Sequence, residues 1–213
     1  MAEYNSDEER FAAVVNFFKD TKNIWLITFA AILAITILVL GTSSYQNKQN
    51  IEASTLYDSW FAGMSDSQDL EANQDIFDEL QSSYSGTGYS QLARMIRGSQ
   101  LAKKGDLQSS LEDFKILAKD TSGFFGNDVL NTLARINIAR IELSNENFSE
   151  ALGALEPLKS SDQHPMIFEL KGDALAGMNK IELAITQYNL ALESTPNKQN
   201  QSMVKIKINN LTQ

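Results

Sequence analysis

The sequence predicts an all-α protein in which a single N-terminal transmembrane helix precedes an α-solenoid of stacked helix pairs. Three observations lead to this prediction. A long uncharged apolar run lies near the N-terminus, the 213 residues include only 3 prolines and few alternating strand-like runs, and a pattern of small and large residues returns along the second half of the chain. A recurring residue pattern of this kind is typical of repeat proteins, in which each unit buries its apolar face against its neighbours.

The apolar run extends from Ile24 to Leu40, interrupted only by two threonines that can hydrogen-bond to their own helix. Weakly apolar residues continue it to residue 44. A helix needs about 20 such residues to cross a hydrocarbon core of about 30 Å. We therefore predict a transmembrane helix over residues 24–44, with Trp25 and Tyr45 at the interfaces.

Two other interpretations of this run fit the sequence less well. A cleaved signal peptide has a short basic leader, whereas here the leader is long and contains Glu3, Asp7, Glu8, Glu9 and Asp20. A buried helix of a soluble domain would show a polar face, and this run has none. The chain has no cysteine, so a lipoprotein anchor is excluded as well.

Basic residues set the expected orientation of the helix. Arg10, Lys19 and Lys22 precede the run, and only Lys48 follows it over a comparable distance. Basic residues accumulate on the cytoplasmic side of membrane helices, and acidic residues count for little. We expect residues 1–23 in the cytosol and residues 45–213 outside the cytoplasm.

The N-terminal segment 1–23 divides into two parts. Its first ten residues are polar and acidic, so we expect them to be disordered. An apolar stripe with helical spacing follows, at Phe11, Val14, Val15 and Phe18. We expect this helix to lie in the membrane interface; the alternative is a helix that docks a cytosolic partner.

A helix is predicted from Gln46 to Met64, directly after the membrane run, and a turn over Gly63–Glu71 ends it. A second helix is predicted before Ser83–Tyr89, where Gly86 and Gly88 are helix-ending signals. The expected buried side of the two helices comprises large apolar residues: Ile51, Leu56, Tyr57, Trp60, Phe61, Ile76, Phe77 and Leu80.

The clearest copy of the repeat extends from His164 to Pro196. Gly172 and Ala184 are small residues that allow two antiparallel helices to approach closely, and larger residues at Leu175 and Tyr188 are expected to fill the space toward the next pair. A turn is expected at Asn179, and Pro196 is expected to stop the second helix. The spacing resembles the tetratricopeptide repeat of 34 residues.

Two earlier segments fit the same frame. Residues 91–119 place Gly98, Leu101, Gly105, Leu107, Ser110, Phe114 and Leu117 at the matching positions, and residues 132–160 place Ala139, Phe148, Ala151, Leu155 and Leu158 there. The longer interval between these two copies contains Thr121–Asp128, which we interpret as an insertion. Arg135 and Glu142 depart from the apolar pattern. Val204, Ile208 and Leu211 predict a final capping helix within 197–213. The alternating KIKIN run in this segment is also compatible with a strand.

Composition excludes several classes of function. With 18 basic and 27 acidic residues, the chain lacks the basic footprint of a nucleic-acid-binding protein. The chain has one histidine, His164, and no cysteine. It therefore lacks the residues for a His-rich metal site and for a Cys/His catalytic pair. The acidic pairs Asp78–Glu79 and Glu112–Asp113 are expected on exposed helix faces. We predict no catalytic, cofactor or metal site and no small-molecule substrate, and expect a protein-binding scaffold.

The order of motifs resembles the YfgM-like proteins, a family of ancillary SecYEG translocon subunits. The resemblance spans nearly the whole chain and rests on SDEER, NFFKDTKN, the apolar run, SGTGYSQLARM, KKGDLQSSLEDF, ARIELSNENFSEAL and VKIKINNL. It departs at Phe17 and Phe18, where a tryptophan pair is often found, and in the degenerate middle repeat.

The resemblance implies a bacterial inner-membrane protein with a cytosolic N-terminus and a periplasmic repeat domain over residues 45–213. The resemblance also implies two partners for the protein, the SecYEG translocon and a membrane-anchored periplasmic chaperone of the PpiD type. The protein would help pass translocated polypeptides to periplasmic chaperones. A tethered assembly factor for another cell-envelope complex is the alternative. An enzyme or a secreted protein with a cleaved N-terminus is a third possibility.

Overall fold

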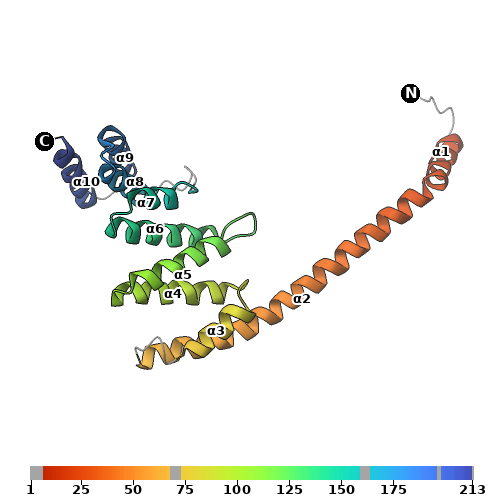
Figure 1. The fold of residues 1–213 in the computed structure, drawn as a ribbon. Coiled ribbons are helices and arrows are strands. Elements are labelled where there is room, and N and C mark those ends of the chain that lie inside the picture. Colours follow the sequence, from red (N-terminus) through yellow and green to blue (C-terminus); the bar gives the residue numbers. More distant parts are fainter. Residues whose placement is uncertain (1–6, 68–72, 159–163, 196–197, 213) are drawn as a thin grey trace. The chain divides into compact units, whose positions relative to one another are not determined.

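A computed structural model describes residues 7–67, 73–158, 164–195 and 198–212 (Figure 1). These residues form helices and no strand, which confirms the predicted all-α class. The helices are α1 (Asp7–Asp20), α2 (Lys22–Ser67), α3 (Gln74–Ser83), α4 (Gly88–Lys104), α5 (Leu107–Asp120), α6 (Asp128–Ser144), α7 (Phe148–Leu155), α8 (Pro165–Gly177), α9 (Ile181–Ser194) and α10 (Lys198–Leu211). The chain divides into two compact units, Met1–Glu52 and Ala53–Gln213.

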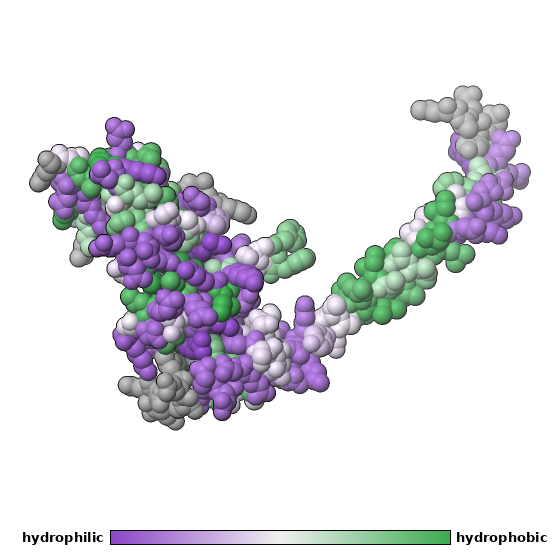
Figure 2. Space-filling view, in the orientation of Figure 1, coloured by the Kyte–Doolittle hydropathy of each residue, from purple (hydrophilic) through white to green (hydrophobic). Residues whose placement is uncertain are grey.

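The first unit contains α1 and the apolar part of α2, which is long and apolar enough to cross a membrane. Its most apolar window has a mean hydropathy of 2.6 and no buried residue, and Figure 2 shows it as a hydrophobic band. The hydroxyls of Thr28 and Thr36 donate to Ile24 O and Ile32 O at 2.9 and 2.8 Å, as predicted. The unit therefore has the properties of a membrane anchor.

The amphipathic lead-in is helical as predicted, but it begins earlier than expected. Asp7–Arg10 form the first turn of α1, so the expectation of disorder is wrong for these four residues. Acidic side chains at Asp7, Glu8 and Glu9 stabilise a helix N-terminus, because they interact favourably with its dipole. Residues 1–6 lie outside the described part of the chain.

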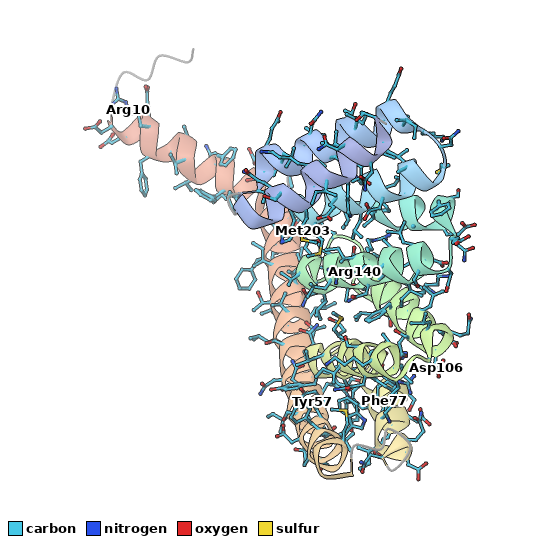
Figure 3. The ribbon with its side chains drawn as sticks, turned by 90° about the vertical axis from the view of Figure 1, so that its left-hand side faces the viewer. Arg10, Tyr57, Phe77, Asp106, Arg140 and Met203 are labelled. Carbon is cyan, nitrogen blue, oxygen red and sulfur yellow. The ribbon has the colours of Figure 1, made fainter. Side chains whose placement is uncertain are left out.

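The second unit begins with the C-terminal part of α2, which packs with α3 and α4 around Trp60 and Phe77. Their rings lie 5.8 Å apart, and both side chains are almost fully buried. Figure 3 shows Tyr57 and Phe77 at this end of the unit. The predicted burial of Ile51 and Phe61 is wrong: these side chains are 60% and 42% exposed.

Two predicted boundaries near this core also shift. Helix α2 continues through Gly63 to Ser67, so the expected turn does not begin at Gly63; residues 68–71 of that turn lie outside the described part. Gly88 does not end a helix but begins α4. The reason is Thr87, whose hydroxyl accepts a hydrogen bond from Ser90 N at 3.3 Å and caps the N-terminus.

Three helix pairs follow, and their tight turns share one backbone conformation. Gly105, Glu146 and Asn179 adopt positive φ values of 86°, 61° and 59°. In each turn the next residue's N–H donates to the carbonyl five residues back: Asp106 to Leu101, Asn147 to Glu142 and Lys180 to Leu175. This arrangement ends helices where the chain enters the left-handed region. Three equivalent turns confirm the predicted repeat.

The crossings within the pairs are also equivalent. A Cβ placed on Gly98 would lie 3.1 Å from Cε1 of Phe114, and one on Gly172 would lie 2.5 Å from Cε1 of Tyr188. In the middle pair Ala139 and Leu155 occupy the matching positions, both fully buried in one cluster. Small residues on the first helix thus allow the close approach that was predicted. Tyr188 was expected to fill the space toward the next pair, but its ring lies against Gly172 within its own pair.

The last helix, α10, packs on α9 and buries Val204, with Ile208 and Leu211 partly buried beside it. This confirms the predicted capping helix, which covers the apolar face that the last pair would otherwise expose. The expected stop at Pro196 lies outside the described residues, as do the last two residues of the 132–160 copy.

Candidate protein-interaction surface

The first helices of the three pairs form the inner side of the stack. Helix α4 contacts α6, and α6 contacts α8. Among the described residues, the second helices α5, α7 and α9 make no comparable contacts with one another. A stack whose first helices approach more closely than its second helices curves toward the first helices. The concave face is therefore made by α4, α6 and α8.

Two hollows occupy this face and share Asn137 and Arg140 of α6. The larger has a volume of about 620 Å³ and the smaller one of about 370 Å³. The larger is lined by Asp128, Val129, Thr132, Leu133, Ile136, Asn137, Arg140, His164, Pro165 and Met166. The smaller is lined by Ser99, Ala102, Lys103, Leu107, Phe114, Asn137, Arg140, Ile141 and Ser144. We call the two together the concave groove; it runs from α4 across α6 to α8.

The groove has an apolar side that follows the repeat. Leu133 on α6 lines the larger hollow and is 40% exposed; Leu92 on α4, outside the two hollows, is 39% exposed at the equivalent position one repeat earlier. Met166 on α8 is the third equivalent residue and is partly buried. Repetition at the same helical position spaces these side chains regularly along the face. Such a ladder suits the alternate side chains of an extended polypeptide.

The other side of the groove is polar and carries Arg140 and Lys103, both exposed. The Arg140 guanidinium lies 2.8 Å from Met166 Sδ, and among the described residues it makes no ion pair. Figure 3 shows where Arg140 lies on α6. Most of its five N–H donors thus remain available for a carboxylate or for carbonyl oxygens. A basic residue in a strongly acidic chain marks this position as chemically distinct.

His164 lies at the end of the groove and has a structural contact. Its Nδ1 accepts a hydrogen bond from Met166 N at 3.4 Å and caps α8, with Pro165 at the first helical position. His164 is therefore the N-cap residue of α8. Within the described part of the chain, no group of three or more His, Cys, Asp or Glu residues could hold a metal ion.

A buried charge cluster lies between α3, α4 and α5. Asp113 is 1% exposed, and its carboxylate accepts hydrogen bonds from Arg94 at 2.9 Å and from Arg97 at 2.7 and 2.8 Å. The Arg97 guanidinium also lies 3.8 Å from the centre of the Phe77 ring. The expected exposure of Asp113 is therefore wrong, whereas Asp78, Glu79 and Glu112 are exposed as expected.

A second charge cluster ties the capping helix to the last pair. Lys207 Nζ lies 2.7 Å from carboxylate oxygens of both Glu169 and Asp173, and Tyr188 donates to Asp173 at 2.8 Å. Burial lowers the pKa of Lys207, but the bonds and charges of the two carboxylates outweigh it and raise the pKa above its ordinary value. Burial and the Asp173 carboxylate raise the pKa of Tyr188. These charges stabilise the end of the stack.

The two departures in the middle repeat are explained by polar contacts. Arg135 donates to Ala154 O at 3.1 Å and to Asn131 Oδ1 at 2.9 Å. Burial lowers the pKa of its guanidinium. Glu142 is 3% exposed and accepts from Lys115 at 3.0 Å and from Asn147 at 2.9 Å. Hydrogen bonds at these positions therefore replace apolar packing without breaking the repeat.

The sequence matches the family described as tetratricopeptide repeat-like domain over residues 16–213. The chain belongs to this family. Among solved structures, MamA 41-end from Desulfovibrio magneticus RS-1 is similar, with a TM-score of 0.55 and 17% sequence identity over 75% of this chain and 88% of that chain. This likeness shows the tetratricopeptide-like fold. Comparison with curated proteins gives no match. Tetratricopeptide repeat-like domains are protein-interaction modules that bind polypeptides on an extended concave surface.

Proposed function

We propose that this protein is a membrane-tethered protein-interaction module associated with the SecYEG translocon, where it helps pass translocated polypeptides to periplasmic chaperones. The observation that carries the binding role is the concave groove. It combines an apolar ladder with Arg140, whose donors are not engaged by a described carboxylate. Extended chains that have left a translocon expose apolar side chains and unpaired backbone groups, and both match this surface.

The anchor supports the second half of the proposal. A tether converts a weak contact into an effectively intramolecular one, with effective concentrations that reach about the millimolar range for short links. The groove would then sample polypeptides close to the membrane that holds residues 24–44. Arg10, Lys19 and Lys22, which precede the apolar run, support a cytosolic N-terminus. The resemblance to the YfgM-like family supports a bacterial inner membrane with the repeat unit in the periplasm.

The partner assignment, SecYEG and a PpiD-like chaperone, rests on the order of motifs that resembles the YfgM-like family. Pull-down from detergent-solubilised membranes tests it. The intact protein is compared with a variant whose residues 24–44 are replaced by an unrelated transmembrane helix. We expect translocon subunits and a periplasmic chaperone with the intact protein, above a tagged control membrane protein. If neither version recovers them, the translocon assignment is wrong, and another cell-envelope complex takes its place.

A variant of the groove separates the repeat domain's contribution from the anchor's. Arg140→Glu reverses the charge at the centre of the groove without touching the core, because the side chain is exposed. Lys205→Glu, a charge reversal at an exposed position of α10 outside the groove, is the matched control. Partner recovery should fall with Arg140→Glu and persist with Lys205→Glu. Equal recovery from both variants would place the binding outside the groove.

A further inference from the structure

The connection between α5 and α6 carries the most exposed large apolar side chains in the described part of the chain. Phe124 is 95% exposed and Phe125 is 97% exposed, and their rings meet edge to face with centroids 5.0 Å apart. The connection projects beyond the two helices that it joins (Figure 1), and its tip is hydrophobic (Figure 2). We call these two residues the phenylalanine tip.

The backbone around the tip holds it in this position. Gly123 has a φ of 94°, and a Cβ on Gly126 would lie 2.1 Å from Thr121 O, so neither glycine tolerates a side chain without strain. Gly126 N donates to Gly123 O at 3.1 Å. Thr121 is 1% exposed, donates to Leu117 O and accepts from Asn131 at 3.2 Å. Both helices therefore fix the base of the connection.

We propose that the phenylalanine tip inserts into the interfacial region of the membrane that holds the chain's own apolar helix. Thr121–Asn127 contains no charged residue, so insertion of the tip desolvates no ion. Interfacial helices bury phenylalanine side chains at the boundary between headgroups and acyl chains, and the buried apolar area contributes to binding without a basic patch. The tip thus suits a lipid surface even though the chain as a whole is acidic.

The length of chain between the anchor and the repeat unit places lipid within reach. The unit begins at Ala53, and the predicted span ends at residue 44. The intervening residues extend by at most about 30 Å even when fully stretched. The unit is therefore held beside the bilayer, where the effective concentration of lipid is high. Two phenylalanine rings alone would bind a free domain to a membrane only weakly. In a chain that its transmembrane helix already anchors, they are sufficient to hold the tip at the lipid surface as a second contact.

Single-cysteine labelling of the intact protein tests this inference, because the chain has no cysteine of its own. Phe125→Cys and the control Ser149→Cys, an exposed position on α7, are labelled with an environment-sensitive fluorophore and reconstituted in phosphatidylcholine liposomes. Lipids with a nitroxide near the headgroup serve as quencher. We expect a blue shift and strong quenching for the probe at position 125, and neither at position 149.

Equal quenching at the two positions would overturn the proposal. So would a blue shift at position 125 that nitroxide lipids do not quench, since a protein pocket or a second copy of the chain would then cover the tip. Phe124→Ser in the protein labelled at position 125 checks the role of the native ring. Its side chain is almost fully exposed, so the melting temperature should not change. Quenching should decrease; unchanged quenching would show that the label drives insertion.

Discussion

Gly172 of α8 lies directly against the ring of Tyr188 of α9: a Cβ on this glycine would be 2.5 Å from the ring's Cε1 atom. The ring occupies the space that a side chain on α8 would need. Its hydroxyl donates a hydrogen bond at 2.8 Å to Asp173, the next residue of α8. The close approach of the two helices therefore depends on the absence of a side chain at residue 172.

Replacement of this glycine gives the first prediction. Gly172→Ala should lower the free energy of unfolding by about 1–3 kcal/mol, because the ring must move in a packed crossing. Gly153→Ala is the control, since a Cβ there would meet no atom within 4 Å. It should raise stability by about 0.5–1 kcal/mol, as alanine favours a helix interior over glycine. Urea titration followed by circular dichroism measures both. Equal shifts in the same direction would refute the crossing.

A second prediction concerns the turn at Glu146, which has a φ of 61°. A non-glycine residue in this region costs about 1–2 kcal/mol, and glycine removes that cost at the expense of a more flexible unfolded chain. Glu146→Gly should therefore stabilise the protein by up to about 1 kcal/mol. Gly105→Ala, at the equivalent turn, should destabilise it by about 1 kcal/mol. Thermal unfolding measures both; a loss of stability in Glu146→Gly would contradict the equivalence of the turns.

The third prediction is a pH dependence that arises from Glu142. Burial raises the pKa of its carboxyl, but hydrogen bonds from Asn147 and Lys115 and the charge of Lys115 outweigh burial, and the net effect lowers the pKa. A lowered pKa contributes stability above the unfolded value of about 4.3, and this contribution is lost as pH falls through the folded value. Glu142→Gln should therefore cost about 1–3 kcal/mol near neutral pH.

The cost of Glu142→Gln should shrink as the pH falls below about 4. Glu112→Gln serves as the control, because Glu112 is exposed on α5; it should change stability by less than about 0.5 kcal/mol. Denaturant titrations of the three proteins at several pH values provide the comparison. A cost that stays constant from neutral to acidic pH would show that the ionised carboxylate does not account for the effect.

The sequence predicted the fold well wherever a repeated position needs a particular residue size. Gly98 and Gly172 mark helix crossings because only small residues fit, and Asn179 marks a turn because it tolerates a positive φ. Glu146 was missed, since glutamate has no such preference and only the frame of the repeat identifies it. Ile51 and Phe61 were misplaced for a related reason: the buried stripe of α2 includes the small Ala53, which a search for large apolar residues overlooks.

The sequence predicted the kind of functional surface, a protein-binding scaffold, but not the residues that form it. A concave protein-binding face follows from any stack of helix pairs, but its residues depend on which helices touch. Arg140 and Leu133 could not be distinguished from other exposed residues of the helix until the contact of α6 with α8 was known. Asp113 was placed on the surface because its partners, Arg94 and Arg97, lie on another helix. A pair that forms between helices leaves no local signal in the sequence.

Site-directed photo-crosslinking in membranes tests the central claim, that the concave groove binds a polypeptide. A photo-reactive amino acid replaces Leu133, which lines the groove on a first helix, or Leu183, which is 56% exposed on a second helix. Position 133 should form crosslinks to another polypeptide chain, and Arg140→Glu in the same protein should weaken them. Position 183 should form none. Crosslinks of equal strength from position 183, or none from position 133, would contradict the account.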